Sequence, residues 1–400
     1  GNFVGPTWWS DNWFVESMAT HVAQKTVQSL NPKLQGHIEA QRLSGIWKLM
    51  ELDSHAHTQA VNVPIDDEQA VINSEDGAKF LKGATVLAML ESWIGVEAFD
   101  LGLRTYLSSK PFGHGTAHEW SEIIQEQTGL PIPSVLDSYM NQPGVPRVDM
   151  NLDCSTGVAV RLQLEQSRGL PFQSIASRAH VWQIPICVRY GDAHSSHAEC
   201  FLMKSPKEVV SLSTSRCPTW LHGNADEAGY YQWTTSSKRL RQLLDEGLVH
   251  LSTVERRGIP QLLHVARDAQ AFSFSEYLAA IEQLLTQVDP IMLNGLLKRM
   301  ETLAQWIPAE QRENALSGWI RKHLRPVFNR LDEETAMGPE ARRIRSVLAY
   351  LGDDPDLQRI AHELSQDFLS NPNQTFRLPP IEFLPLAARS GGPDLWTKLK

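Results

Sequence analysis

Apolar residues recur at helical spacing over the first 150 or so residues of the chain. Phe14, Met18 and Val22 share one face of a predicted helix. Asp11 can cap the start of this helix, and Asn31-Pro32 can end it. The pattern therefore predicts a helical N-terminal part.

Two more helices are predicted over about 76–94 and 96–107, with Gly95 as the stop between them. Prolines between Pro131 and Pro146 then interrupt the helical pattern. We interpret this proline-rich stretch as the boundary at which the helical part ends.

The pattern changes to period two in the middle of the chain. Apolar and polar residues alternate over 158–164 and over 182–190, which predicts half-buried strands. Turn signals at Tyr190-Gly191-Asp192 and at Gly223-Asn224 suit hairpins. A small β-sandwich between about 155 and 236 is the simplest arrangement of such strands.

The helical period returns from Ser237 onward, where Leu240, Leu243 and Leu244 begin the first of several apolar stripes. Short helices joined by Pro- and Gly-containing turns predict helix pairs stacked side by side. We expect this part to be incomplete, because Asp394-Leu395-Trp396 resembles the start of another helix.

These changes of period predict a multidomain α+β protein with domains at 1–153, 154–236 and 237–400. The chain has 400 residues, of which 42% are hydrophobic and 21% are charged, as in ordinary globular proteins. A formal net charge of -9 argues against nucleic acid as a partner, because phosphate binding needs a basic face. No apolar run approaches the roughly 18 residues of a membrane-spanning helix.

Four cysteines bear on the cellular compartment: Cys154, Cys187, Cys200 and Cys217. None belongs to a Cys-x-x-Cys pair, and we favour buried free thiols over one or two disulfides in a secreted protein. The chain opens on Gly1-Asn2-Phe3-Val4 without a recognisable leader, and we expect it to begin inside a domain. Its start therefore does not give the compartment, and a cytoplasmic location is slightly favoured.

Residues 8–20 contain the most informative carboxylate of the chain, Glu16, and read Trp-Trp-Ser-Asp-Asn-Trp-Phe-Val-Glu-Ser-Met-Ala-Thr. Three tryptophans predict a heavily packed element, so we expect Glu16 to avoid a freely solvated face. A partly buried carboxylate needs a cation, a metal or a set of donors. From the residues alone, a capping or ion-pair role is favoured over a metal ligand.

This segment resembles the zinc aminopeptidases of the gluzincin superfamily, a family that includes alanyl, leukocyte and puromycin-sensitive aminopeptidases. Their pattern is H-E-x-x-H-x-W-F-G-N followed by W-W-x-D-x-W-L-N-E-G-F-A, in which two histidines and the last glutamate bind zinc. The residues in register with it are Gly1, Asn2, Trp8, Trp9, Asp11, Trp13, Glu16 and Ala19. The resemblance implies that Glu16 is the third zinc ligand and that both histidines would precede Gly1.

Further motifs extend the resemblance over roughly residues 1–270. Lys82-Gly83-Ala84 is similar to the family's K-G-A helix, and Trp182-Gln183-Ile184-Pro185-Ile186 to its W-x-I-P-L strand. Gly229-Tyr230-Tyr231 is similar to its G-Y-Y strand. The implied architecture is the helical half of a thermolysin-like catalytic domain at 1–153, then a β-sandwich and a HEAT-like α-helical solenoid.

The resemblance also implies chemistry. In the family, zinc activates a water that cleaves the N-terminal residue from a peptide, and a tyrosine on the K-G-A helix stabilises the oxyanion. Phe80 occupies this tyrosine position and has no donor. Loss of one oxyanion donor typically costs about 10²–10³ in turnover. Asp11 is a candidate acceptor for a zinc-bound histidine, with helix capping as an equal alternative.

Two functions are compatible with these residues. The favoured one is a zinc-dependent aminopeptidase acting on peptides, of which this chain is a piece that is inactive and binds no zinc alone. The alternative is a catalytically dead scaffold or peptide-binding protein. Departures from the family pattern support it, at Val15, Ser17, Gln59, Phe80 and Gln232.

Three other clusters resemble metal sites only in part, and we interpret them as polar surface or loop residues. They are His118 with Glu122, His55 with His57, and His194 with His197 and Cys200.

Overall fold

The computed structural model describes most of the chain, namely residues 3–30, 35–63, 65, 77–155, 159–171, 173–287, 290–312, 316–331, 338–376, 378–390 and 397. It divides into two compact units, Gly1–Phe274 and Ser275–Lys400. Several predictions concern segments outside the described residues: Gly1-Asn2, Asn31-Pro32, the residues just before Gly77, the start of the first strand pattern near Gly157, and Asp394-Leu395-Trp396.

The first unit opens with helices, as predicted. Short elements come first: β1 (Gly5–Pro6), η1 (Trp9–Asp11) and, later, β2 (His114–Gly115). The helices are α1 (Asn12–Leu30), α2 (Gln35–Asp53), α4 (Gly77–Ile94), α5 (Val96–Ser109), α6 (Ala117–Thr128) and α7 (Ile132–Met140). The helices predicted over 76–94 and 96–107 are confirmed by α4 and α5.

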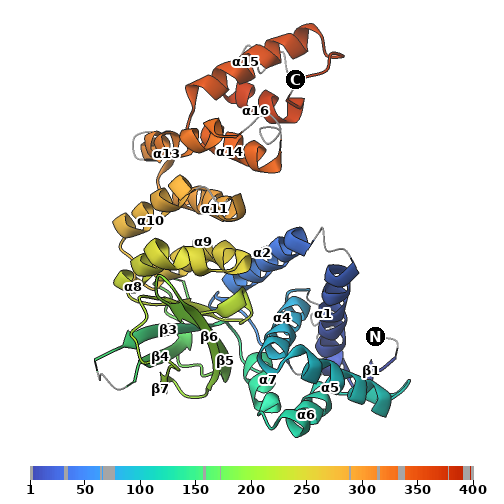
Figure 1. Ribbon diagram of the computed structural model, residues 1–400. Coiled ribbons are helices and arrows are strands. Elements are labelled where there is room, and N and C mark those ends of the chain that lie inside the picture. The colour runs from blue at the N-terminus through green and yellow to red at the C-terminus, as the bar shows by residue number, and fades with distance from the viewer. Residues whose placement is uncertain are drawn as a thin grey trace. The chain divides into compact units, whose positions relative to one another are not determined.

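Helix α1 packs along α4, and α5 packs against α6 (Figure 1). An aromatic cluster fills the space between them, in which Phe14 contacts Trp120 and Tyr106 and Phe99 contacts Trp120. Thr116 begins α6 with a reciprocal capping box to Glu119. This core fixes the positions of α1 and α4, the two helices that carry Glu16 and Phe80.

The interpretation of Pro131–Pro146 as a break in helical structure is wrong, because α7 (Ile132–Met140) lies within it. Pro133 stands in the first helical turn, where a missing N–H removes no intrahelical hydrogen bond. Strand β3 (Pro146–Asp153) also begins earlier than the predicted start of the β part at about residue 155.

Seven strands form two sheets in the middle of the chain. One sheet has the order β7-β4-β3-β9 and the other the order β6-β5-β8. Besides β3, their bounds are β4 (Arg161–Arg168), β5 (Ile184–Gly191), β6 (Ser196–Met203), β7 (Lys207–Ser211), β8 (Trp220–His222) and β9 (Gln232–Thr234). Leu162 and Leu164 of β4 are buried between exposed neighbours, so the period-two prediction is confirmed there.

The two predicted hairpin turns have different outcomes. Tyr190-Gly191-Asp192 does join the antiparallel pair β5 and β6. Gly223-Asn224 does not form a hairpin, because β8 and β9 belong to different sheets and β9 pairs in parallel with β3. The Asn224 side chain exchanges two hydrogen bonds with Gly229, which folds the intervening residues into a compact crossing.

The favoured interpretation of the cysteines as free thiols is wrong. Cys187 and Cys200 face each other across β5 and β6 and form a disulfide, and Cys154 and Cys217 form another. Their Cα atoms are 4.1 Å and 5.7 Å apart, respectively. Strand register brings Cys187 and Cys200 together, while Cys154 and Cys217 meet from the loops that follow β3 and β7.

The remainder is helical. Unit one ends with η3 (Ala225–Glu227) and α8 (Ser237–Gln242), the π-helical turn η4 (Leu243–Gly247), η5 (Leu248–His250) and α9 (Thr253–Asp268). Unit two contains α10 (Phe274–Gln287), α11 (Pro290–Trp306), α12 (Ala309–Arg312), α13 (Gly318–Asn329), α14 (Pro339–Tyr350), α15 (Pro355–Ser370) and α16 (Pro380–Ser390).

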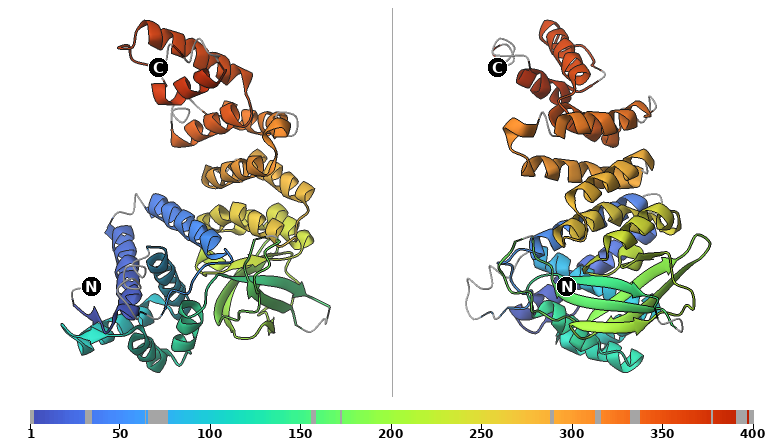
Figure 2. Two further views of the ribbon diagram at one scale, coloured as in Figure 1. Left: turned by 180° about the vertical axis from the view of Figure 1, so that it is seen from behind. Right: turned by 90° about the vertical axis from the view of Figure 1, so that its left-hand side faces the viewer.

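Helices α14, α15 and α16 pack on one another within unit two (Figure 2). Among the described helices, none is long and apolar enough to cross a membrane. The protein is thus a mixed α+β structure, and the division at residues 153/154 and 236/237 stays a prediction.

Candidate functional site

Glu16 lies in the first turns of α1 with its side chain exposed. The buried face of this helix carries Phe14, Ser17 and Met18, and Glu16 points away from it. The expectation that Glu16 avoids a solvated face is therefore wrong for this chain. The tryptophans differ in the same way, since only Trp13 of the three is buried. Trp8 and Trp9, in contrast, are exposed large aromatic residues, so this segment is packed on one side only.

Phe80 is half-buried and lies on α4, the helix that packs along the helix of Glu16. The Ser17 hydroxyl donates a hydrogen bond of 3.0 Å to the main-chain carbonyl of Phe80. Gly83 permits this approach, since a Cβ atom there would stand 2.1 Å from Oγ of Ser17. The structure therefore brings the helix turns of Glu16 and Phe80 together.

Asp11 lies in η1, half-buried, next to the start of α6. Burial raises the pKa of its carboxyl above the ordinary value, and the nearby Glu119 carboxylate adds to this effect. Backbone N–H groups of Trp8 and Ala117 hydrogen-bond to the carboxylate and act in the opposite direction. Asp11 thus ties the N-terminal segment to the first residue of α6.

The described residues contain no group of three His, Cys, Asp or Glu side chains that could hold a metal ion. The other clusters have ordinary roles: His118 lies 3.3 Å from Glu122 in an exposed pair, and Cys200 is in a disulfide. A zinc site needs three or four protein ligands, and Glu16 offers one carboxylate. The described residues alone therefore do not fit a zinc ion.

A buried ionic cluster that the sequence did not reveal joins α1, α4 and α5. Nε2 of His21 lies 2.7 Å from Glu91, and Lys25 pairs with both Glu91 and Asp100. Burial would raise the pKa of Glu91, but hydrogen bonds from His21 and Lys25 outweigh it and hold the pKa below its usual range. The helical spacing of His21 and Lys25 was the available signal.

A second buried cluster anchors α4, the helix of Phe80, to the β part. Nζ of Lys82 lies 2.8 Å from Asp53 and donates to the Gly144 carbonyl at 3.0 Å. The Tyr230 hydroxyl donates to the same Asp53 carboxylate at 2.9 Å. Burial lowers the pKa of Lys82, although Asp53 opposes the shift. Four segments far apart in the sequence meet here, so no local pattern could predict the contact.

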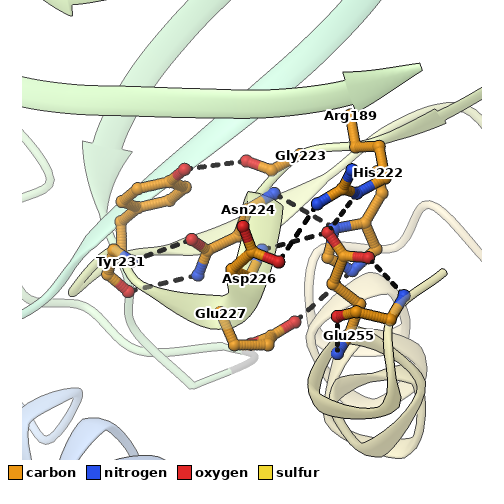
Figure 3. Close-up of polar contacts among 10 residues, drawn as sticks. Arg189, His222, Gly223, Asn224, Asp226, Glu227, Tyr231 and Glu255 are labelled. Atoms are coloured by element: carbon orange, nitrogen blue, oxygen red, sulfur yellow. Dashed lines mark hydrogen bonds and ion pairs between the residues drawn. The ribbon is translucent and has the colours of Figure 1, made fainter. Parts of the chain in front are cut away.

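A third cluster, the Glu255 cluster, joins β5, the β8–β9 connection and α9 (Figure 3). Glu255 is completely buried and accepts from Nε of Arg189 at 2.7 Å and from the Asp226 N–H at 3.0 Å. It also closes a capping box with Ser252 at the start of α9. Burial would raise the pKa of Glu255, but His222, Arg189 and these N–H groups hold it below its usual range.

Two consecutive residues of the Glu255 cluster have left-handed backbone conformations. Asp226 and Glu227 have φ of +56° and +49°, which is costly for residues other than glycine. Arg189 holds Asp226 at 3.0 Å, and Nε2 of the buried His222 lies 3.4 Å from Glu227 (Figure 3). The charged contacts thus keep this loop in a conformation that it would not adopt by local preference.

Comparison with known proteins supports the resemblance seen in the sequence. The model of the Peptidase family M1 domain matches residues 1–139. Aminopeptidase M1-C of rice (Oryza sativa subsp. japonica) is 25% identical over 315 residues, covering 72% of this chain and 35% of its own length. Tricorn protease-interacting factor F2 of Thermoplasma acidophilum is 24% identical over 312 residues, covering 78% of this chain and 37% of its own length.

Glutamyl aminopeptidase of mouse is 26% identical over 313 residues, covering 76% of this chain and 31% of its own length. The chain thus spans about a third of the length of the curated relatives that it matches. The matched region contains α1 and α4, and with them Asp11, Glu16 and Phe80. On these grounds residues 1–139 match the Peptidase family M1 domain, and the chain is similar to aminopeptidases over about three quarters of its length.

Proposed function

We propose that this chain is part of a zinc-dependent aminopeptidase that removes N-terminal residues from peptides, with Glu16 as the third zinc ligand. The exposed carboxylate of Glu16, on a helix whose opposite face is buried, carries the proposal. A side chain that binds a metal together with ligands from another segment must point away from the core that its helix packs on, as the side chain of Glu16 does. The two histidine ligands would come from residues numbered before Gly1.

In this proposal the described clusters hold the ligand-bearing helix in place. His21 and Lys25 fix α1 on Glu91 of α4. The pair of Lys82 and Asp53 fixes α4 on the end of α2. Asp11 would accept a hydrogen bond from a zinc-bound histidine, which orients such ligands in metal sites generally. The 400-residue chain alone would be inactive, because one carboxylate does not hold zinc.

The second candidate is a catalytically dead relative that binds peptides or serves as a scaffold. Phe80 favours it, because a phenyl ring offers no hydrogen-bond donor to an oxyanion. The Ser17 hydroxyl on the neighbouring helix is already donated to the Phe80 carbonyl. The finer arrangement, a thermolysin-like half followed by a β-sandwich and a helical solenoid, belongs to the same proposal.

The test uses a longer form of the protein that includes the residues before Gly1. Zinc measured by mass spectrometry should be near one ion per chain, and Glu16→Gln should lower it strongly. Glu97→Gln is the matched control, since Glu97 is an exposed carboxylate on α5. Equal zinc content in the Glu16 variant and the wild type would refute the ligand assignment.

Hydrolysis of amino-acid arylamides then separates the two candidates. A slow enzyme should gain about 10²–10³ in turnover from Phe80→Tyr, as expected for one restored oxyanion donor. A zinc-loaded protein that stays inactive with tyrosine at position 80 would be the scaffold instead.

A further inference from the structure

A cavity of about 360 Å³ lies within unit two, between α14, α15 and α16. Its wall is mainly apolar, formed by residues such as Leu357, Ile360, Phe383 and Leu386. Pockets for small molecules are concave, largely apolar and about 300–1,000 Å³ in size, with a few convergent polar groups. The cavity has this character and is separate from the region of Glu16 and Phe80.

The charged groups that line the cavity form one cluster with an excess of positive charge. Nε of Arg342 lies 2.8 Å from Glu382, and a terminal nitrogen of Arg345 lies 2.9 Å from the same carboxylate. Among the described residues that line the cavity, Glu382 is the single carboxylate. Arg389 adds a third guanidinium nearby, 5.9 Å from the ring of Tyr350, whose carbonyl it also contacts.

Arg342 is the group best placed to meet a ligand. Its side chain is 58% exposed, and in the described part of the chain it meets Glu382 through Nε. An arginine that is already oriented by one carboxylate can receive a second one through its terminal N–H groups. The cavity therefore combines an apolar interior with an anion acceptor at its rim.

We propose that this cavity binds an amphipathic monocarboxylate, an acyl chain with one carboxylate, with the chain between the three helices and the carboxylate on Arg342. A volume of 360 Å³ corresponds to about a dozen water-sized groups, which suits an acid of roughly ten carbons. Burial of the acyl chain supplies the driving force, and the arginines select an acid over an alcohol. This inference does not depend on the proposed zinc site.

The probe is decanoate, used below the concentration at which it aggregates, with binding to the 400-residue chain followed by calorimetry. We expect saturable binding of one decanoate per chain and at least tenfold weaker binding of decanol. Ser346 lines the cavity from an exposed position on α14, so Ser346→Trp should fill the space and reduce affinity at least tenfold.

Arg342→Gln should weaken decanoate about five- to twentyfold and leave decanol unchanged. Arg359→Gln is the matched control, because Arg359 is an exposed arginine of α15 paired with Glu363, away from the cavity wall. Absence of saturable binding overturns the proposal, as does equal affinity of the Arg342 and Arg359 variants. Should Ser346→Trp fail to fold, as judged by circular dichroism, this arginine pair decides the question.

Discussion

The hydroxyl of Ser17 on α1 and the carbonyl of Phe80 on α4 are joined by a hydrogen bond of 3.0 Å. The family pattern has glycine at the position of Ser17 and tyrosine at that of Phe80. The two departures therefore meet in space, one residue away from Glu16. Gly83 accommodates the larger residue at position 17, because it leaves the Ser17 side chain room against α4.

We expect Gly83→Ala to destabilise the chain by about 1–3 kcal/mol, the usual cost of overpacking. The new Cβ would stand 2.1 Å from Oγ of Ser17 and 2.9 Å from Trp13. Urea unfolding measures the change. Gly45→Ala in α2 is the control, since the nearest atom to a Cβ there is 3.9 Å away, and it should stabilise by up to about 1 kcal/mol. Similar changes in the free energy of unfolding for Gly83→Ala and Gly45→Ala would contradict the close packing of Gly83 against Ser17.

Removal of the buried cation at position 82 should be far more costly than removal of an exposed one. Lys82→Met leaves the Asp53 carboxylate buried without its cation, and we expect a loss of about 3–5 kcal/mol in the free energy of unfolding. Lys110→Met breaks the more exposed pair with Glu119 and should cost about 0.2–1 kcal/mol. A loss below about 1 kcal/mol for Lys82→Met would show that the buried Asp53 carboxylate does not need the charge of Lys82.

The Glu91 cluster should make stability depend on acid pH. His21 and Lys25 hold the pKa of Glu91 in the folded protein below 4.5, the ordinary value that applies in the unfolded chain. The ionised Glu91 therefore stabilises the fold fully at pH values above 4.5. This stabilisation is lost as the pH falls through the lower pKa of the folded protein. The stability gap between wild type and Glu91→Gln should therefore shrink from about pH 5.5 to about pH 3. Glu122→Gln, at an exposed position, should show little gap at either pH. A stability difference between wild type and Glu91→Gln that is the same at about pH 5.5 and about pH 3 would contradict the lowered pKa of Glu91.

The two disulfides give a prediction about mass and stability. The unreduced chain should be lighter than the reduced one by the mass of four hydrogen atoms, with Cys154–Cys217 and Cys187–Cys200 found as linked peptides. In the chain-entropy model, closing separations of 63 and 13 residues stabilises by about 4 and about 3 kcal/mol. Double Cys→Ser variants of each pair, compared by thermal unfolding, test this order.

The same experiment bears on the compartment. Disulfides persist in oxidising surroundings, so their recovery from the native source would favour a secreted or luminal location over the cytoplasmic one suggested by the sequence. Free thiols in material alkylated at the moment of lysis would favour the cytoplasm.

Local periodicity predicted the elements whose burial follows from their own sequence. Helices α4 and α5 and strands β4 and β5 are examples, because each carries a regular apolar face. Helix α7 was missed, since its prolines were read as breakers although one of them stands in the first helical turn, where it is tolerated. The crossing at Gly223-Asn224 was missed because Asn224 satisfies the backbone of Gly229 with its side chain, which a turn signal does not distinguish from a hairpin.

The candidate site was predicted by motif and register, while its surroundings were not. Asp11, Glu16 and Phe80 were identified from one short pattern and one helix motif, and their roles stay predictions. Their supporting contacts, such as Lys82 with Asp53 and Tyr230, link residues far apart along the chain and depend on the tertiary fold. The exposure of Glu16 also depends on which side of α1 the core covers.

Glu255 serves two elements at once, since it begins α9 through its capping box and holds Arg189 of β5. Loss of either partner leaves the same buried carboxylate with fewer donors. The opening of the helix end and the detachment of the strand are therefore expected to occur as one event rather than two. Amide protons on both elements would then exchange with solvent at a common rate, and the β part and α9 would form a single cooperative unit across the change from strands to helices.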